Sequence, residues 1–415
     1  MEHQNELFSQ ALQIVSPWIV KGSCFEGKPK KLLLELDLRE GTTRLPCPCC
    51  EAQDCPVHDR KERVWRHMNF WQYETEIRAR VPRVKCGKCG TRQVRVPWAR
   101  EGSGFTLLFE AMALRLASEM PVGSAAAIVG ENDKRIWTII HHYVDKARAK
   151  NVWDGVGRVA VDETSRRKGH LYVTNFIDLD SGDLLFMTGG KDGETIGEFA
   201  RQLVDYHGAA ENIVEIAMDM SPAFQKGAAL YLPDARRVFD HFHVMQLAGE
   251  AFDEVRKEAA REVGGLGKGS MWALRGNASR LSDESLRLRE RLCREYGKIG
   301  RAMGLREGLQ DLWNYDKREA AAEHFGWWYS WARRSRLPAF KKLAKTLADH
   351  LEGILNYYHN WTTSALIEAI NGKLQLARKR ARGYRNIDNF RAIAYWIAGG
   401  LQPATGLPNP MPQPF

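Results

Sequence analysis

The chain has 415 residues, of which 44% are hydrophobic, and a formal net charge of +10 at pH 7. This length exceeds what a single hydrophobic core usually supports, so we expect several domains. No apolar run approaches the roughly 20 residues of a membrane-spanning helix, and the acidic, polar first residues do not fit a signal peptide. We therefore expect a cytoplasmic protein with no membrane among its partners.

The basic residues indicate the class of partner. The chain holds 61 Lys and Arg against 51 Asp and Glu, and a polyanion explains such an excess because each neutralised phosphate releases counterions. Cations gather in the segments 78–100 and 333–345, and a third segment, 369–387, has no acidic residue. The cations of this third segment are Lys373, Arg378, Lys379, Arg380, Arg382 and Arg385. Three such clusters favour nucleic acid over a membrane surface.

The first predicted element is a metal-binding module in residues 1–100. Closely spaced cysteines in an intracellular chain indicate metal before disulfides. Two C-x-x-C motifs each place two thiolates on one tight turn, and the pair provides the tetrahedron of a structural zinc site. The predicted ligands are Cys47, Cys50, Cys86 and Cys89. The segment between the motifs, 65–84, is rich in aromatic and β-branched residues and predicts strands, so the module is zinc-ribbon-like.

Three further residues leave the zinc ligands open. They are Cys49, Cys55 and His58. We favour one pair of thiolates from each motif, with Cys55 or His58 as the substitute ligand. A site closed by four thiolates leaves no position for a reacting water, so this zinc is expected to be structural.

Residues 101–152 predict a helix-turn-helix unit. Apolar residues at helical spacing precede Pro121, which ends the first helix. An alanine-rich stretch, 124–129, leads to a Gly-containing turn, after which Asp133 can cap a longer helix over 134–148. This succession is typical of a DNA-binding helix-turn-helix, although a plain helical bundle would show it too. The candidate DNA contacts at the start of the longer helix are Lys134 and Arg135.

From residue 153 the hydrophobic period changes to that of strands. The pattern predicts, in chain order, three strands, a helix, a strand, a helix and a strand. These elements are the strands 159–162, 171–179 and 184–187, the helix 194–206, the strand 213–218, the helix 223–231 and the strand 237–239. This is the order of the ribonuclease H-like fold, whose fourth strand lies parallel to the first and beside it. We predict that residues 153–250 form the first part of an α/β catalytic domain.

Two aspartates follow strands that are neighbours in this topology. Asp162 ends the first strand and Asp219 ends the fourth, so both lie at the same edge of the sheet. Two close carboxylates repel each other and stay ionised only with a cation between them. Oxygen ligands suit Mg²⁺ or Mn²⁺. Two such ions, about 3.5–4 Å apart, can activate an attacking hydroxyl and stabilise the leaving oxygen of a phosphodiester.

A helix predicted over 362–382 supplies the third carboxylate. Glu368 lies opposite the apolar stripe of this helix, on a polar face that continues into the basic residues of 369–387. Such a face suits a DNA backbone that runs along the helix from the metal ions. The preceding residues are helical in pattern and predict an all-helical insertion over 251–355, which interrupts the catalytic domain. Its C-terminal helices then fall in 356–400, and a proline-containing tail, 401–415, ends a multidomain α+β chain.

Four sequence blocks carry a resemblance to a known family. They are Val-Asp162-Glu-Thr-Ser-Arg-Arg-Lys-Gly-His, Met-Asp219-Met-Ser-Pro, Phe-Asp240-His-Phe-His243-Val, and Ile-Glu368-Ala-Ile-Asn with Arg-Gly-Tyr-Arg-Asn after it. With the zinc module and the helix-turn-helix before them, these blocks resemble the ISL-three family of bacterial insertion-sequence transposases. Glu51 departs from the family, which tends to have Gly after this cysteine motif.

The resemblance implies a function and a set of site residues. It implies an Asp-Asp-Glu catalytic triad at Asp162, Asp219 and Glu368 that works with Mg²⁺. It implies binding of double-stranded DNA at terminal inverted repeats, in a bacterial protein associated with the nucleoid. A homodimer is expected because two ends must be cut together. Asp240 and His243 match a further motif of related transposases and are predicted as auxiliary residues, with a helix N-cap and a packed histidine as the alternative.

The helical insertion also offers a DNA contact. Trp272 is a candidate for stacking on an extruded base, because the cation Arg275 follows it closely. Most other tryptophans of the insertion are expected in its core.

Two other functions compete with transposition. A non-catalytic DNA-binding regulator would use only the zinc module and the helix-turn-helix, and would not need three carboxylates. A metallohydrolase could instead be built on a histidine-rich group, but no partner carboxylate has a suitable spacing. That group is His207, Asp240, His241 and His243.

Overall fold

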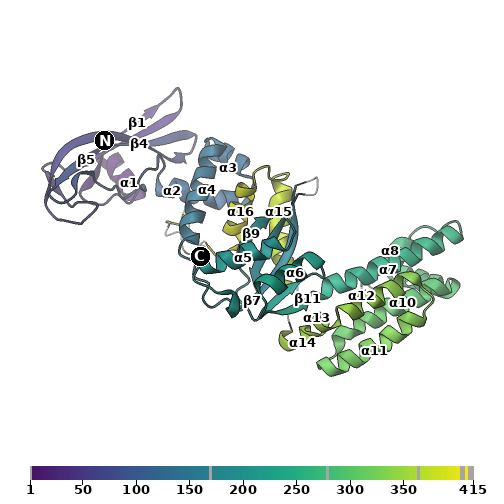
Figure 1. Cartoon of the computed structure of the whole chain (residues 1–415). Helices are drawn as coiled ribbons and strands as arrows, with labels where there is room; N and C mark the ends of the chain where they lie inside the picture. Colours follow the sequence, from purple (N-terminus) through teal and green to yellow (C-terminus); the bar gives the residue numbers. More distant parts are fainter. Residues whose placement is uncertain (1, 168–170, 277–279, 362–364, 402–406, 410–415) are drawn as a thin grey trace. The chain divides into compact units, whose positions relative to one another are not determined.

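The computed structural model describes residues 2–167, 171–276, 280–361, 365–401 and 407–409. It divides into two compact units (Figure 1). The first contains Met1–Lys150, Lys379–Ile397 and Leu401–Phe415, and the second contains Asn151–Arg378 and Ala398–Gly400. The predicted tail, 401–415, therefore lies outside the described residues except at 401 and 407–409. Among the described helices, none is long and apolar enough to cross a membrane.

The first unit is built on a mixed sheet that is larger than the sequence pattern indicated. The strands are β1 (Trp18–Glu26), β2 (Lys31–Leu38), β3 (Arg44–Leu45), β4 (Cys55–Phe70), β5 (Tyr73–Cys86) and β6 (Gly90–Gln93), preceded by helix α1 (Glu2–Ala11). Their order is β1-β2-β5-β4-β3, with β6 paired to β5. In β2 every second residue is a buried leucine. Successive side chains of a strand point to opposite faces of the sheet, and these leucines point to the face that packs against the hydrophobic core.

Three helices follow the sheet in the positions expected for the helix-turn-helix. They are α2 (Leu107–Glu119), α3 (Val122–Val129) and α4 (Asp133–Arg148). Gly130 closes α3 in a left-handed conformation (φ 70°), which glycine adopts without steric cost. The predicted cap of α4 is wrong by one residue. Asn132 is the N-cap, since its side chain accepts the Lys134 N–H at 2.9 Å, and Asp133 is the first helical residue.

One C-terminal helix also belongs to the first unit. Helix α16 (Ile387–Ala398) packs on α4, with the Arg148 guanidinium 3.7 Å from the ring centre of Tyr395 and the His141 ring 2.9 Å from the Asn389 carboxamide. The sequence pattern had grouped these residues with the catalytic domain.

The second unit contains the strands and helices predicted after residue 153. The strands are β7 (Arg158–Arg167), β8 (Leu171–Asp178), β9 (Leu184–Gly189), β10 (Glu215–Met218) and β11 (Arg236–Phe239), and the helices between them are α5 (Glu194–Asp205) and α6 (Pro222–Tyr231). The strand order is β11-β10-β7-β8-β9. As predicted, β10 runs parallel to β7 and next to it, and β11 continues the parallel part.

Helices α5 and α15 (Ala365–Arg380) lie on opposite faces of this sheet. On β8 the consecutive residues Asn175 and Phe176 must point to opposite faces. Phe176 stacks on Phe199 of α5, with ring centres 4.4 Å apart, whereas Asn175 donates to Asn371 of α15 at 3.3 Å. The face that carries α15 is the one that matters for the site.

The segment between β11 and α15 is helical, as predicted. Its helices are α7 (His241–Glu262), α8 (Ser270–Arg275), α9 (Asp283–Glu295), α10 (Gly297–Gln310), α11 (Arg318–Arg334), α12 (Pro338–Asp349), α13 (Leu351–Leu355) and α14 (Tyr357–Asn360), drawn in green in Figure 1. Their buried side chains, Trp328 among them, continue the hydrophobic core of the sheet. Trp272 stays 72% exposed.

The predicted helix over 362–382 is shorter in the structure. Residues 362–364 lie outside the described part, and α15 ends at Arg380. Arg382 follows with a positive φ of 55°, so it does not continue the basic face of the helix.

Candidate functional site

Three aspartates lie at one level at the carboxyl end of the parallel strands. In the register of β7 and β10, Ala160 pairs with Ala217, so two residues further on Asp162 is level with Asp219. In the register of β10 and β11, Met218 pairs with Phe239, which puts Asp240 level with Asp219. Residues level in a parallel sheet point to the same face. Strand order and register therefore bring Asp162, Asp219 and Asp240 side by side.

The carboxylates share an acidic environment. Burial raises the pKa of Asp162, opposed by the N–H of Glu163, the nearby His243 and a hydrogen bond from Asn371, while the charge of Asp240 raises it further. Burial also raises the pKa of Glu163, with the charges of Asp219 and Asp162 adding to the effect. A carboxyl whose ionisation is opposed by burial and by like charges gains most from a bound cation. The donor set therefore fits a hard divalent metal ion.

Asn371 connects α15 to this cluster, and its place on the helix face of Glu368 is the only sign of it in the sequence. Its Nδ2 donates to the carboxylate of Asp162. Its Oδ1 accepts from the Thr164 hydroxyl at 3.0 Å and from the buried Asn175 side chain at 3.3 Å. These contacts fix both the orientation of Asp162 and the position of α15 over the sheet.

Glu368 lies one helical turn before Asn371 on α15. Residues three apart share a helix face and differ in height by about 4.5 Å. Its side chain is exposed, and its charge acts on His241. Among the described residues, however, the carboxylate oxygens of Asp162, Asp219 and Glu368 do not all come within 4.8 Å of one another. Glu368 thus lies on the side of α15 that faces the aspartates, but its carboxylate does not complete a compact three-carboxylate cluster with Asp162 and Asp219.

The residues suggested for a metallohydrolase lie at two separate places in the second unit. Asp240 is the N-cap of α7, and its carboxylate accepts from the ring Nδ1 of His243 at 2.9 Å. This bond, followed by the charges of Asp240, Asp162 and Asp219, raises the pKa of His243. His207 follows α5 and precedes β10, so it lies toward the opposite end of the parallel strands. The four residues suggested for a metallohydrolase do not gather.

The predicted zinc ligands do come together in the first unit. One ligand atom from each of Cys47, Cys50, Cys86 and Cys89 lies within 4.8 Å of the others. The Sγ atoms of Cys50 and Cys86 are 3.6 Å apart, close to the roughly 3.8 Å edge of a tetrahedron with Zn–S distances of about 2.3 Å. Cys49 and His58 are exposed and lie outside this group, and Cys55 bonds a backbone carbonyl through its thiol.

Backbone amides favour the thiolate form in this cluster. The N–H groups of Cys89 and Lys88 lower the pKa of Cys86 to about 6. The amides of Cys50 and Cys49 likewise lower the pKa of Cys47. Because the thiolate is the form that binds metal, the first cysteine of each motif is preorganised for zinc.

Comparison with known proteins decides between the competing functions. Residues 159–394 match the DDE model of family ISL3, which is described as a transposase. The chain belongs to the ISL3 family of DDE transposases. Residues 94–144 match the helix-turn-helix domain of transposase family ISL3, and residues 44–89 match the zinc-finger of transposase IS204/IS1001/IS1096/IS1165.

Individual relatives agree with the family models. The transposase is 27% identical over 373 residues to the transposase for insertion sequence element IS1001 of Bordetella parapertussis, an alignment that covers 86% of this chain and 89% of the relative. It is 28% identical over 377 residues to the transposase for insertion sequence element IS1557 of two Mycobacterium tuberculosis strains, with 82% of each chain covered. The predicted family, the zinc-ribbon with its four-cysteine cluster and the DNA-binding enzyme class are thereby confirmed.

The cations predicted to contact DNA in this transposase differ in what they touch. Arg378 donates to the Ser165 hydroxyl at 3.2 Å, and Arg380 donates to the Glu119 carbonyl at 2.7 Å. Arg135 pairs with Glu131 at 2.8 Å, and Arg275 lies 3.8 Å from Asp253. The remaining cations of the set have exposed side chains, namely Lys134, Lys373, Lys379, Arg382 and Arg385.

Proposed function

We propose that this transposase cleaves phosphodiesters at the ends of an insertion sequence and joins the 3′-OH ends to target DNA, using Asp162, Asp219 and Glu368. The observation that carries the proposal is the register that sets Asp162 level with Asp219. Strand order, a parallel β7–β10 pair and helices on both faces support a ribonuclease H-like catalytic domain. Helices α7–α14 are then its insertion.

Each residue has a distinct part in this proposal. Asp162 and Asp219 would hold two Mg²⁺ or Mn²⁺ ions, and Glu368 would hold one of them. When bound, the ions supply charge stabilisation to the attacking and leaving oxygens of the phosphodiester. Asn371 orients Asp162 through its hydrogen bond. Asp240 orients His243 as an auxiliary residue, placed to hold or release a proton beside the aspartates.

We assign the contacts with DNA by the position of the cations. The exposed first turn of α4, with Lys134 and Arg135, would enter the major groove at the terminal inverted repeats. The basic side of α15 and the residues after it, Lys373 to Arg385, would follow the backbone away from the active site. Paired cleavage of two ends would require a homodimer.

The domain boundaries in the proposal follow the sequence. They are a zinc-binding module at 1–100 with Cys47, Cys50, Cys86 and Cys89 as ligands, a helix-turn-helix at 101–152, catalytic segments at 153–250 and 356–400, an insertion at 251–355 and a tail at 401–415. Within 356–400, helix α16 packs with the first unit.

Replacing Asn371 tests the proposed metal site without touching a metal ligand. In Asn371→Ala the Asp162 carboxylate loses the donor that fixes it, while Thr164 and Asn175 lose their acceptor. Loss of such a supporting contact typically lowers metal affinity or activity by about 10- to 100-fold. We expect a decrease of this size both in Mn²⁺ affinity, measured by titration, and in the rate of cleavage of a DNA end.

Gln375→Ala provides the matched control, since Gln375 is exposed on the same helix one turn further on. It should change neither quantity. If Asn371→Ala binds Mn²⁺ as tightly as the wild-type chain, Asp162 is not the ligand that we propose.

A further inference from the structure

A pocket opens beside the loop that connects the zinc module to the helix-turn-helix. It encloses about 470 Å³, and its walls come from β4, from the segment after β6 and from the loop 100–104. That space greatly exceeds the roughly 30 Å³ of one water molecule, so a phosphate group and its sugar fit within it. The pocket lies wholly inside the first unit.

The walls of this pocket combine basic and apolar residues. Its cations are Arg63, Arg95 and Arg100, and its one carboxylate is that of Glu101. Arg100 is already paired with the buried Glu110, whereas Arg63 bonds the Gln93 side chain at 3.3 Å. Within the described part of the chain, Arg95 makes no hydrogen bond or ion pair and its side chain is exposed. Two arginines therefore remain for an anion, and the planar guanidinium suits phosphate oxygens.

A buried network holds the loop 100–104 in place. The carboxylate of Glu110, which is fully buried in α2, accepts from Arg100 at 2.9 Å, from the Ser103 hydroxyl at 2.7 Å and from the Tyr143 hydroxyl at 2.5 Å. Because a buried carboxylate without partners is costly, these groups must stay in contact. The loop that forms one wall of the pocket is thus preorganised by α2 and α4.

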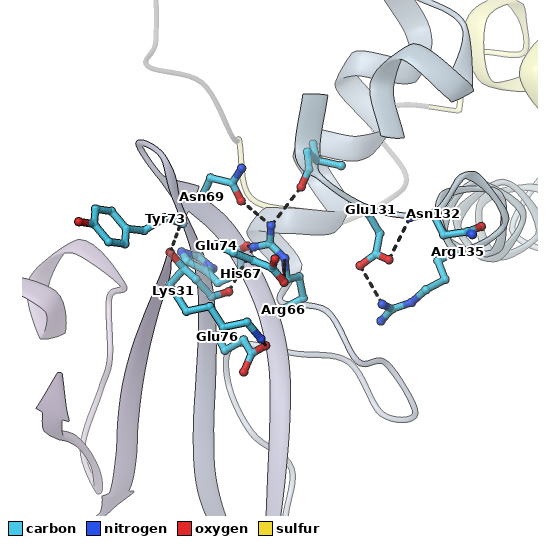
Figure 2. A network of polar contacts seen from close by, with 12 residues as sticks. Lys31, Arg66, His67, Asn69, Tyr73, Glu74, Glu76, Glu131, Asn132 and Arg135 are labelled. Carbon is cyan, nitrogen blue, oxygen red and sulfur yellow. Dashed lines mark hydrogen bonds and ion pairs between the residues drawn. The ribbon is translucent and has the colours of Figure 1, made fainter. Parts of the chain in front are cut away.

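Arg66 connects the same loop to the sheet and to α3, and Figure 2 shows its guanidinium among the polar groups around it. Its backbone N–H donates to the Gly104 carbonyl at 2.8 Å, and its guanidinium donates to the Val129 carbonyl at 3.1 Å and pairs with Glu74 at 3.2 Å. Only 6% of the Arg66 surface is exposed, so Arg66 is a buried residue that links these elements through its hydrogen bonds. These contacts connect the sheet, the pocket wall and the helix-turn-helix within the first unit.

One wall of the pocket lies next to the first turn of α4. Arg135 packs over the Phe105 ring, 4.2 Å from its centre, and Glu131 holds its guanidinium at 2.8 Å (Figure 2). A Cβ built on Gly104, a residue of the pocket wall, would lie 3.4 Å from the Arg135 side chain. Arg135 thus lies between the pocket and the exposed end of the helix that we expect in the major groove.

We infer that this pocket, with Arg95 and Arg63 as its cations, binds a backbone phosphate of the DNA segment that α4 reads. A phosphate contact beside the groove positions the recognition helix but carries no sequence information. The zinc module then serves to hold one wall of this site in register with α4. This inference rests on the proposed reading of terminal repeats by α4, although its test measures binding alone.

The test is the affinity of the full chain for DNA as the salt concentration changes, measured by fluorescence anisotropy. We would compare Arg95→Gln with the wild-type chain on a duplex carrying the element's end and on a duplex of scrambled sequence. We expect Arg95→Gln to weaken both by about tenfold, equivalent to about 1.4 kcal/mol, and to reduce the slope of log K against log salt by about 0.9, the contribution of one phosphate. Arg63→Gln should act in the same direction.

Arg39→Gln is the matched control, because Arg39 is an exposed cation of the same module that lies outside the basic segments and does not line the pocket. It should leave affinity and slope unchanged. An unchanged slope in Arg95→Gln, or an equal effect of Arg39→Gln, overturns the inference. If the wild-type chain binds both duplexes equally, the proposed reading of terminal repeats fails instead, while a uniform loss in Arg95→Gln still supports the phosphate site.

A second measurement locates the phosphate on the DNA. Duplexes with a single neutral methylphosphonate linkage would be bound by the wild-type chain and by Arg95→Gln. We expect one position near the α4 contact to weaken the wild-type complex and to have no further effect on Arg95→Gln, as two changes to one contact should not add. Additive effects at every position would contradict a contact between Arg95 and that phosphate.

Discussion

Asp219→Asn is expected to bind the ends of the element normally and to cleave neither of them. The substitution removes one of the two carboxylates that strand register sets level, and with it the charge that holds both metal ions. Loss of a single preorganised donor in an active site costs about 10²–10³-fold in rate, and we expect loss of a shared metal ligand to cost at least as much. Cleavage and joining should decrease together, because both steps use the same site.

The fold of Asp219→Asn should be intact. The Ser221 N–H donates to Asp219 at 2.9 Å, and the carboxamide oxygen of Asn can accept this bond. Asp180→Asn is the matched control. Asp180 is an exposed aspartate of the turn between β8 and β9, and it pairs with Arg158, the residue at which β7 begins. This control should cleave at the wild-type rate. Cleavage by Asp219→Asn at the rate of Asp180→Asn would remove Asp219 from the active site.

Loss of zinc is expected to unfold the N-terminal module. In Cys86→Ser one thiolate of the cluster is gone, and structural zinc sites contribute about 10–16 kcal/mol of apparent binding energy at neutral pH. Strand β5 ends at this residue, and its pairing with β4 forms the wall that carries Arg63. We therefore expect zinc content to fall below one ion per chain, rapid hydrogen exchange over residues 44–89, and at least tenfold weaker DNA binding.

Two other cysteines serve as controls for that experiment. Cys49→Ser changes an exposed cysteine inside the first motif, and Cys55→Ser changes the buried neighbour of the cluster. Both chains should retain one zinc ion, measured by elemental analysis. Loss of zinc in Cys55→Ser with full retention in Cys86→Ser would move the fourth ligand from Cys86 to Cys55.

The sequence predicted the catalytic strands better than the N-terminal sheet. The two aspartates could be placed because each ends a short apolar run, and because a parallel crossover allows few arrangements. Strand β2 has an equally clear alternation of leucines, but no motif drew attention to it. The alternation is typical of a strand, but the pairing of β2 with the distant β5 depends on contacts that a local pattern does not contain.

The residues that support the site could not be predicted from the sequence for a related reason. Asn371 is one polar residue on a polar helix face, and only the three-dimensional packing of α15 shows that it meets Asp162 and Thr164. The cap of α4 could not be assigned from the sequence, since Asn132 is as good an N-cap as Asp133 and the two residues are adjacent. The structural role of Glu110 could not be predicted either, because the sequence does not show whether an acidic residue in a helix is buried or exposed.

Glu163 also lies near the aspartates, whose charges raise its pKa after burial does, so it is the alternative to Glu368 as the third carboxylate. Glu163 follows Asp162 on β7, so its side chain starts toward the opposite face of the sheet. Glu368 instead shares a helix face with Asn371, which contacts Asp162.

The measurement is single-turnover cleavage of a DNA end by Glu368→Gln and Glu163→Gln, assayed side by side with Mg²⁺ and at saturating protein. We expect Glu368→Gln to lose cleavage by at least about 10²–10³-fold, as for a preorganised group of the active site, and Glu163→Gln to stay within about tenfold of the wild-type rate. Full activity in Glu368→Gln together with loss in Glu163→Gln would contradict the assignment of Glu368.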